Sequence, residues 1–308
     1  MFAPMALHVL ALLPGSPPSR SGFRMRSSVL MTSTESAAAA LSSTQASALD
    51  NVVSVLSLEE KDYPSEVGFD SFTLGGAGAG NVRAFDAPGK TNVAWCSKLD
   101  FVSTDQSLSR ITAWCGPLTD VPHLVVSTGV SGGGIDLSID FRPRADAGYE
   151  LRQPDGTYPE PTSREAFMQG STRVEYSKAF FTEEATAWAA AVCAAEGAVV
   201  HPPSTDGRLI ALQGPLMLNL RLPLSDNGVN VASHACASAV ARWVEWMQTT
   251  DELNRLKVTS TYARDTKLRA TLFGIDSEAL TARFGEEGRS LAAADAGPLD
   301  EAYVGGAS

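Results

Sequence analysis

The stretch from residue 92 to residue 142 constrains the fold more than any other part of this chain, because it is patterned as consecutive β-strands. In its last strand, apolar and polar residues alternate. The apolar face has Ile135, Leu137, Ile139 and Phe141, and the polar face has Asp136, Ser138, Asp140 and Arg142. A period of two residues predicts a half-buried strand. The same pattern predicts strands over 93–103, 107–116 and 123–129. The glycine-rich turn at 130–134 predicts a β-hairpin.

Apolar residues at helical spacing lie on both sides of this stretch. They predict helices over 43–61, 174–196, 229–247 and 252–273, and a last helix from about residue 277. One or two more strands are predicted around Gly214 and Pro215. Strands gathered in the middle of the chain, without regular alternation of strand and helix, favour an antiparallel sheet covered by helices. The expected fold class is α+β.

The N-terminal segment has the composition of a targeting sequence. Residues 1–34 contain three arginines and no acidic residue, and an apolar run at 6–13 precedes a part rich in serine, proline and arginine. The run is too short to span a bilayer, which takes about 20 residues. We interpret residues 1–45 as a disordered two-part leader, for secretory entry and then import into a plastid bounded by extra membranes. The alternative is a disordered N-terminus without a targeting role. The folded domain is expected at 46–308.

The charge balance narrows the class of partner. The whole chain carries −11 and residues 1–34 carry +3, so the remainder carries −14. A domain this acidic is not expected to bind nucleic acid or anionic lipid through a general electrostatic field. No segment after the leader is apolar enough to predict a membrane span.

Several sequence patterns that carry chemistry in other proteins are incomplete here. The cysteines at 96, 115, 193 and 236 lack the spacings of zinc or iron–sulfur sites, so we expect no metal and mostly buried thiols. The GxSxG match at 129–133 runs into a strand and not into the helix that a hydrolase nucleophile requires. The glycines at 75–80 lack the GxGxxG spacing, so we expect a flexible loop and no nicotinamide or flavin.

The polar face of the strand at 135–142 has two interpretations. Asp136, Asp140 and Arg142 either form a solvated sheet face, or they form a pocket floor where a carboxylate exchanges protons beside an arginine. His123 begins the neighbouring strand. A structural role is the simpler reading for each histidine, but His123 is retained as a candidate because of its position.

Three segments in this order resemble red chlorophyll catabolite reductase, a plastid relative of the ferredoxin-dependent bilin reductases. They are SLSRITAWCGPLTDVPHLVV at 107–126, IDLSIDFRPRAD at 135–146, and RDTKLRATLFGIDSEALTARFGEEGRSL at 264–291. Between them, GPLMLNLRLPLS and ARWVEWM follow the family's order of elements. The resemblance covers about 90–295, and it is carried by the order and spacing of the segments.

The resemblance implies an α/β/α sandwich with an open-chain tetrapyrrole in a pocket on one face of the sheet. It implies a reductase in the plastid stroma that takes single electrons from ferredoxin, without a bound cofactor, to reduce a carbon–carbon double bond of red chlorophyll catabolite. It also allows a homodimer. Two alternatives stay open: a bilin-binding protein without catalysis, and a reductase acting on biliverdin.

The resemblance also implies which residues form the site. The family's second acid matches Asp276, with Ile275 as the competing match, and Ser127 stands where the family has its first acid. Since a serine hydroxyl is too weak an acid to replace it, Asp140 or His123 is expected to take over that role. Arg142 and Arg144 are suited to bind the carboxyl groups of the substrate through paired hydrogen bonds. The expected substrate contacts are Val125, Ser127, Ser138, Arg142, Arg144 and Arg221.

Overall fold

One antiparallel sheet organises the described part of the chain. The computed structural model describes residues 33–61, 72–73, 78–87, 92–116, 118–144, 178–202, 209, 212–250 and 255–298. Within these residues nine strands pair in the order β1-β3-β4-β5-β6-β7-β9-β8, and β2 pairs with β3. The strands are β1 (Glu59–Lys61), β2 (Phe72–Thr73), β3 (Ala79–Asp86), β4 (Val93–Val102), β5 (Gln106–Cys115), β6 (His123–Ser131), β7 (Gly134–Arg142), β8 (Val199–Val200) and β9 (Leu218–Pro223).

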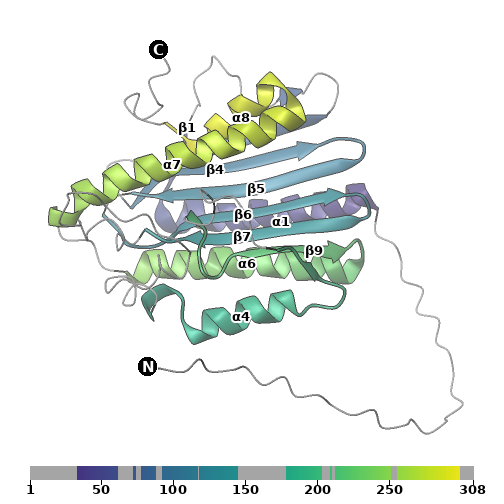
Figure 1. Ribbon diagram of the computed structural model, residues 1–308, viewed down its shortest axis with the longest axis horizontal. Helices are drawn as coiled ribbons and strands as arrows, with labels where there is room; N and C mark the ends of the chain where they lie inside the picture. Colours follow the sequence, from purple (N-terminus) through teal and green to yellow (C-terminus); the bar gives the residue numbers. More distant parts are fainter. Residues whose placement is uncertain are drawn as a thin grey trace, which may run out of the picture. The chain divides into compact units, whose positions relative to one another are not determined.

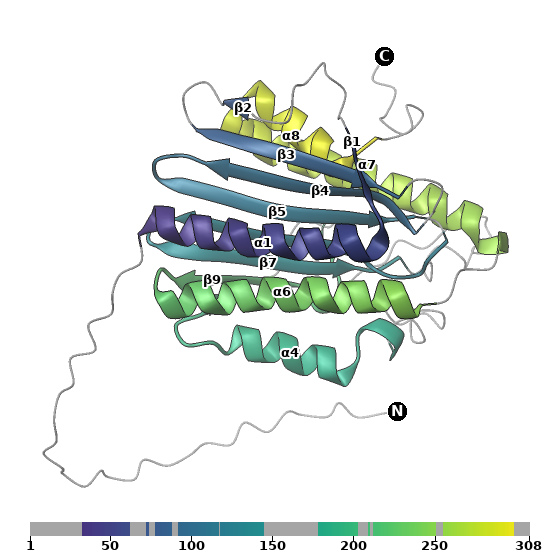
Figure 2. The same cartoon turned by 180° about the vertical axis from the view of Figure 1, so that it is seen from behind.

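Helices cover both faces of this sheet. Figure 2 shows α1 (Thr34–Leu56), α4 (Glu183–Cys193) and α6 (Asp226–Thr249) on one face. Figure 1 shows α7 (Arg255–Phe284) and α8 (Glu286–Ala296) on the other. The predicted α+β class and the α/β/α arrangement are therefore confirmed. None of the described helices is long and apolar enough to cross a membrane.

The two faces of the sheet differ in polarity, and this difference positions the site. The face toward α1 and α6 is mainly apolar, with Ile111, Val126 and Ile139 fully buried. It also holds a buried polar cluster, in which Ser109 contacts Gln45 of α1, Lys98 and Asp100. The opposite face is apolar only under α7 and α8, where Leu99 and Phe101 pack. From β5 onward this second face carries hydroxyls and charges. The polar part of the sheet thus begins at β5, where Arg110 pairs with residues of α7 and α8, and continues over β6 and β7.

The turn between β6 and β7 is the predicted hairpin. Gly132 and Gly133 have φ angles of 51° and 75°. Two successive positive φ values match the two-residue hairpin turn that follows the twist of the strands. Ser131 is the last residue of β6, so the GxSxG match lies in a hairpin, as the sequence indicates.

The first helix begins earlier than predicted. Ser33 caps α1 by accepting a hydrogen bond from the backbone N of Ser36, and Leu41 and Gln45 are buried. Residues 34–45 therefore belong to the folded domain and not to a disordered leader, so the boundary at residue 45 is wrong. The physical reason is the alanine-rich sequence after Ser33, which favours helix and brings α1 close to the sheet. Residues 1–32, the rest of the predicted leader, lie outside the described residues.

Three smaller expectations are also corrected. Leu209 and Leu212 are helical and not part of a strand. Gly274 lies inside α7, and the helix ends at Gly285, whose φ of 74° ordinary residues rarely adopt. Ala79 and Gly80 begin strand β3 and are not part of a flexible loop. The cysteines are as expected, since Cys96, Cys115 and Cys236 are buried.

Candidate functional site

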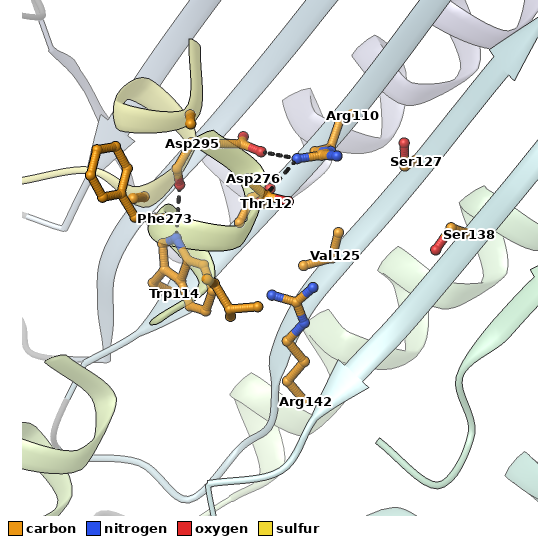
Figure 3. A pocket seen from close by; sticks show the side chains of 13 residues that line it. Arg110, Thr112, Trp114, Val125, Ser127, Ser138, Arg142, Phe273, Asp276 and Asp295 are labelled. Atoms are coloured by element: carbon orange, nitrogen blue, oxygen red, sulfur yellow. Dashed lines mark hydrogen bonds and ion pairs between the residues drawn. The ribbon is translucent and has the colours of Figure 1, made fainter. Parts of the chain in front are cut away.

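A cavity of about 110 Å³ lies between the polar part of the sheet and the helices α7 and α8. Strands β5, β6 and β7 form its floor, and α7 and α8 form its wall (Figure 3). Its lining residues combine charged, hydroxyl and apolar side chains: Arg110, Thr112, Trp114, Val125, Ser127, Ser138, Arg142, Leu272, Phe273, Asp276, Ala292, Asp295 and Ala296. Of the predicted site residues, the structure brings Val125, Ser127, Ser138, Arg142 and Asp276 together here.

One end of the cavity holds a guanidinium between two carboxylates. Nη1 of Arg110 lies 2.7 Å from Oδ2 of Asp295 and 3.4 Å from Oδ2 of Asp276 (Figure 3). Burial lowers the pKa of Arg110, but the charges of Asp276 and Asp295 outweigh it and raise that pKa above its ordinary value. The Asp276 side chain is 31% exposed and that of Asp295 only 5%. Asp276 is thus the carboxylate that faces a ligand.

Two polar atoms beside this pair lack a partner. The hydroxyl of Thr112 and Nε of Arg110 are both buried without a hydrogen bond to any described residue. Both residues belong to β5 and line the cavity. Because buried polar atoms are nearly always satisfied, this part of the floor suits a ligand that brings its own polar group.

Arg142 lies at the other end of the cavity. Its guanidinium lies 5.9 Å from the ring centre of Trp114, and its Nε donates to Oδ2 of Asp140 at 3.2 Å. Asp140 is 2% exposed and also accepts a hydrogen bond from the backbone N of Gly214 at 2.8 Å. The structure therefore places Asp140 behind Arg142, where it orients the guanidinium and does not line the cavity.

The floor continues into a second cavity. Ser127 stands opposite Ser138 in the pairing of β6 with β7. Both serines line the first cavity and a neighbouring one of about 330 Å³, which extends over β7 toward Asn219. Arg221 lines neither cavity and donates to Oδ1 of Asp136, which lines the second one, at 2.7 Å. A long ligand would therefore cross the two serines.

His123 and Arg144 lie in a separate buried cluster. Nδ1 of His123 accepts from the backbone N of Cys115 at 3.0 Å, and its Nε2 lies 3.2 Å from Oδ1 of Asp265. Arg144 forms an ion pair with the same carboxylate. Burial lowers the pKa of His123 to about 4, against the effect of Asp265. Burial raises the pKa of Asp265, but the charge of Arg144 outweighs it and brings the value to about 2. These contacts join β6, the end of β7 and α7, and neither His123 nor Arg144 lines the cavity.

Four residues of the cavity were not predicted from the sequence: Arg110, Thr112, Trp114 and Asp295. The first three alternate along β5, and Arg110 is directly opposite Ser127 on β6. The period of two in this strand, applied together with the candidate Ser127, would have placed all three on the same face. For Asp295 on α8 no comparable signal exists, because it reaches the site through helix packing.

Comparisons with known proteins support the architecture. No protein-family model matches the chain, and no curated protein matches its sequence. Among solved structures, the chain is similar to that of phytochromobilin synthase from tomato in complex with biliverdin, with a TM-score of 0.56 and 12% sequence identity. The match covers 80% of this chain and 79% of that chain. The two proteins share a fold. The resemblance to red chlorophyll catabolite reductase stays a prediction.

Proposed function

We propose that this protein is a plastid reductase of an open-chain tetrapyrrole that receives its electrons from ferredoxin. The observation that carries the proposal is the cavity over β5, β6 and β7, where Asp276 and Arg142 stand at opposite ends of a floor of hydroxyls and apolar side chains. The shared fold with an enzyme whose crystal structure holds biliverdin, itself an open-chain tetrapyrrole, supports the same ligand class.

Each part of the cavity suits one part of such a ligand. Trp114, Val125 and Phe273 offer apolar surface to pyrrole rings. Arg142 suits a propionate, because a guanidinium binds a carboxylate through two parallel hydrogen bonds. Pockets for ligands of this size measure about 300–1,000 Å³. The first cavity is smaller than that, so the ligand would also occupy the second.

Reduction of one carbon–carbon double bond consumes two electrons and two protons. Ferredoxin supplies the electrons one at a time, and we assign Asp276 as a proton donor because its carboxyl group lines the cavity. His123 and Asp140 are less suitable donors than the sequence suggested. His123 is fully buried in the cluster with Asp265, and Asp140 is engaged by Gly214 and Arg142.

Red chlorophyll catabolite is the proposed substrate, on the strength of the sequence resemblance. Biliverdin is the competing substrate, because it is the ligand named for the tomato enzyme. An anaerobic assay with reduced ferredoxin separates the two. The visible absorbance of red catabolite should fall while that of biliverdin persists. Loss of biliverdin alone would assign the second substrate. Binding of either pigment without reduction would identify a bilin-binding protein.

The proposed compartment is the plastid stroma, since both ferredoxin and chlorophyll breakdown occur there. The acid-free residues 1–34 support an N-terminal targeting leader. Import of the full-length chain into isolated plastids, followed by N-terminal sequencing, tests this part. A mature N-terminus at or before Ser33 agrees with the start of α1 at Thr34.

A further inference from the structure

We infer that Asp295 is a positioning residue, which keeps Asp276 able to exchange a proton by taking up the charge of Arg110. This inference rests on the proposed function, because it concerns the residue assigned there as proton donor. It adds a residue on a different helix, α8, which neither the sequence pattern nor the fold comparison points to.

Asp295 is held in place from the sheet. Its Oδ1 accepts a hydrogen bond from the hydroxyl of Ser97 at 2.9 Å, and its backbone carbonyl accepts one from Nε1 of Trp114 at 2.8 Å. Its Oδ2 accepts from Nη1 of Arg110 at 2.7 Å. With its side chain 5% exposed, this carboxylate is fixed and has little contact with solvent.

Arg110 is shared unequally between the two carboxylates. The same nitrogen that lies 2.7 Å from Asp295 lies 3.4 Å from Asp276. The short, buried contact anchors the guanidinium to Asp295, and Asp276 makes the longer contact while its charge still acts on Arg110. A carboxylate that is the sole ion-pair partner of an arginine is strongly favoured in its charged form. Here Arg110 is shared with a second carboxylate, Asp295.

This arrangement matches what the reduction needs. A proton donor must take up a proton before each turnover and release it to the substrate. If Asp295 were neutral, Arg110 would face Asp276 alone, and Asp276 would be kept as a carboxylate. Asp295 therefore acts on the reaction through Arg110, without touching the substrate.

The test follows the protonation of Asp276 in the ligand-free protein. Carbon-13 NMR of protein labelled at the aspartate carboxyl groups reports each titration, and loss of one signal in Asp276→Asn assigns it. In Asp295→Asn, Asp276 should titrate about one pH unit or more below the wild-type protein. In Arg110→Gln it should titrate above the wild type, because Asp295 is then unpaired beside it. The double variant should return close to the wild type.

The matched control is Glu60→Gln, which removes an acid paired with Arg83 at 2.8 Å on another part of the sheet. It should leave the Asp276 titration unchanged. An unshifted titration in both Asp295→Asn and Arg110→Gln would overturn the inference. The two single variants carry opposite expected signs, so failure of one to fold leaves the other decisive.

Turnover supplies the second readout. With the tetrapyrrole that the wild type reduces, Asp295→Asn should lower kcat about tenfold at neutral pH with an unchanged KM, and the double variant should recover much of the loss. A double variant that is slower than both single variants indicates a merely structural role and contradicts the inference. If the wild type reduces no tetrapyrrole while the titrations shift as stated, the proposed function fails and the coupling of Asp295 to Asp276 stands.

Discussion

Arg110 stands directly opposite Ser127 on the neighbouring strand, and both side chains line the same cavity. Nη1 of this guanidinium is paired from the other side, by Asp295 on α8 at 2.7 Å. The negative charge at this end of the cavity thus comes from the helices and not from β6. Arg110 is therefore paired although residue 127 is a serine.

Replacing Ser127 by glutamate should increase turnover. The side chain lines both cavities, so a longer acid has room, and Arg110 opposite it would hold the carboxylate in the site. General acid catalysis contributes about 10²–10⁴-fold to a rate, and we expect a gain of about tenfold with red catabolite. Initial rates of absorbance loss provide the measurement. Ser127→Gln is the control, and an equal gain in it would show that acidity is not the cause.

Arg142→Ala should weaken substrate binding more than it slows the reaction. A hydrogen bond to a charged group contributes about 1.5–3 kcal/mol, so the Kd of the tetrapyrrole should rise about 10- to 100-fold. The esterified pigment lacks the carboxylate, and it should bind wild type and variant equally well. The control is Arg242→Ala. It removes an arginine of α6 that pairs with Glu184 of α4, on the face of the sheet opposite the cavity. A larger effect on the ester than on the free acid would contradict the assignment.

The cluster of His123 with Asp265 should make the fold sensitive to acid. The pKa of His123 is about 4 in the folded protein and 6.5 ordinarily, so the unfolded chain binds the proton first as the pH falls. The histidine's contribution is complete above pH 6.5 and is lost as the pH falls toward 4, at about 1 kcal/mol per pH unit. Urea unfolding across this range measures the slope.

His123→Gln should lower the free energy of unfolding at neutral pH and flatten this slope. The amide can replace one of the two hydrogen bonds but does not titrate. Asp265 adds a second loss at lower pH, as the pH falls from about 4 toward its folded pKa of about 2. A slope between pH 6.5 and 4 that is as steep in His123→Gln as in the wild type would show that another group causes the acid sensitivity.

Truncation should separate the leader from the fold. A chain that begins at Ser33 retains the cap of α1 and should unfold at the same temperature as the full-length protein. A chain that begins at residue 46 loses Leu41 and Gln45, whose amide donates to the Thr128 hydroxyl at 3.0 Å. Removal of one buried leucine side chain alone costs about 2–5 kcal/mol, so the shorter chain should be destabilised by at least about 2 kcal/mol. Equal melting temperatures would show that α1 is dispensable.

The sequence predicts the sheet better than the site. Alternation in β7 and the glycines of the β6–β7 turn encode their structure locally, and both predictions are confirmed. Ser138 lies on the polar face that this alternation predicts, and Val125 and Ser127, which the resemblance implied, line the same cavity. The positions of Arg144 and His123 could not be predicted, because both depend on Asp265, more than 100 residues later in the chain. Asp295 reaches Arg110 through the packing of α8, which no local pattern encodes.

The central claim is that Asp276 gives a proton to a tetrapyrrole held over this sheet. The most direct test is a single-turnover reduction, under anaerobic conditions, of red chlorophyll catabolite by reduced ferredoxin with wild-type protein and with Asp276→Asn. The account predicts that both proteins bind the pigment with similar affinity, and that the variant reduces it at least about 100-fold more slowly. Reduction at the wild-type rate by Asp276→Asn would contradict the account.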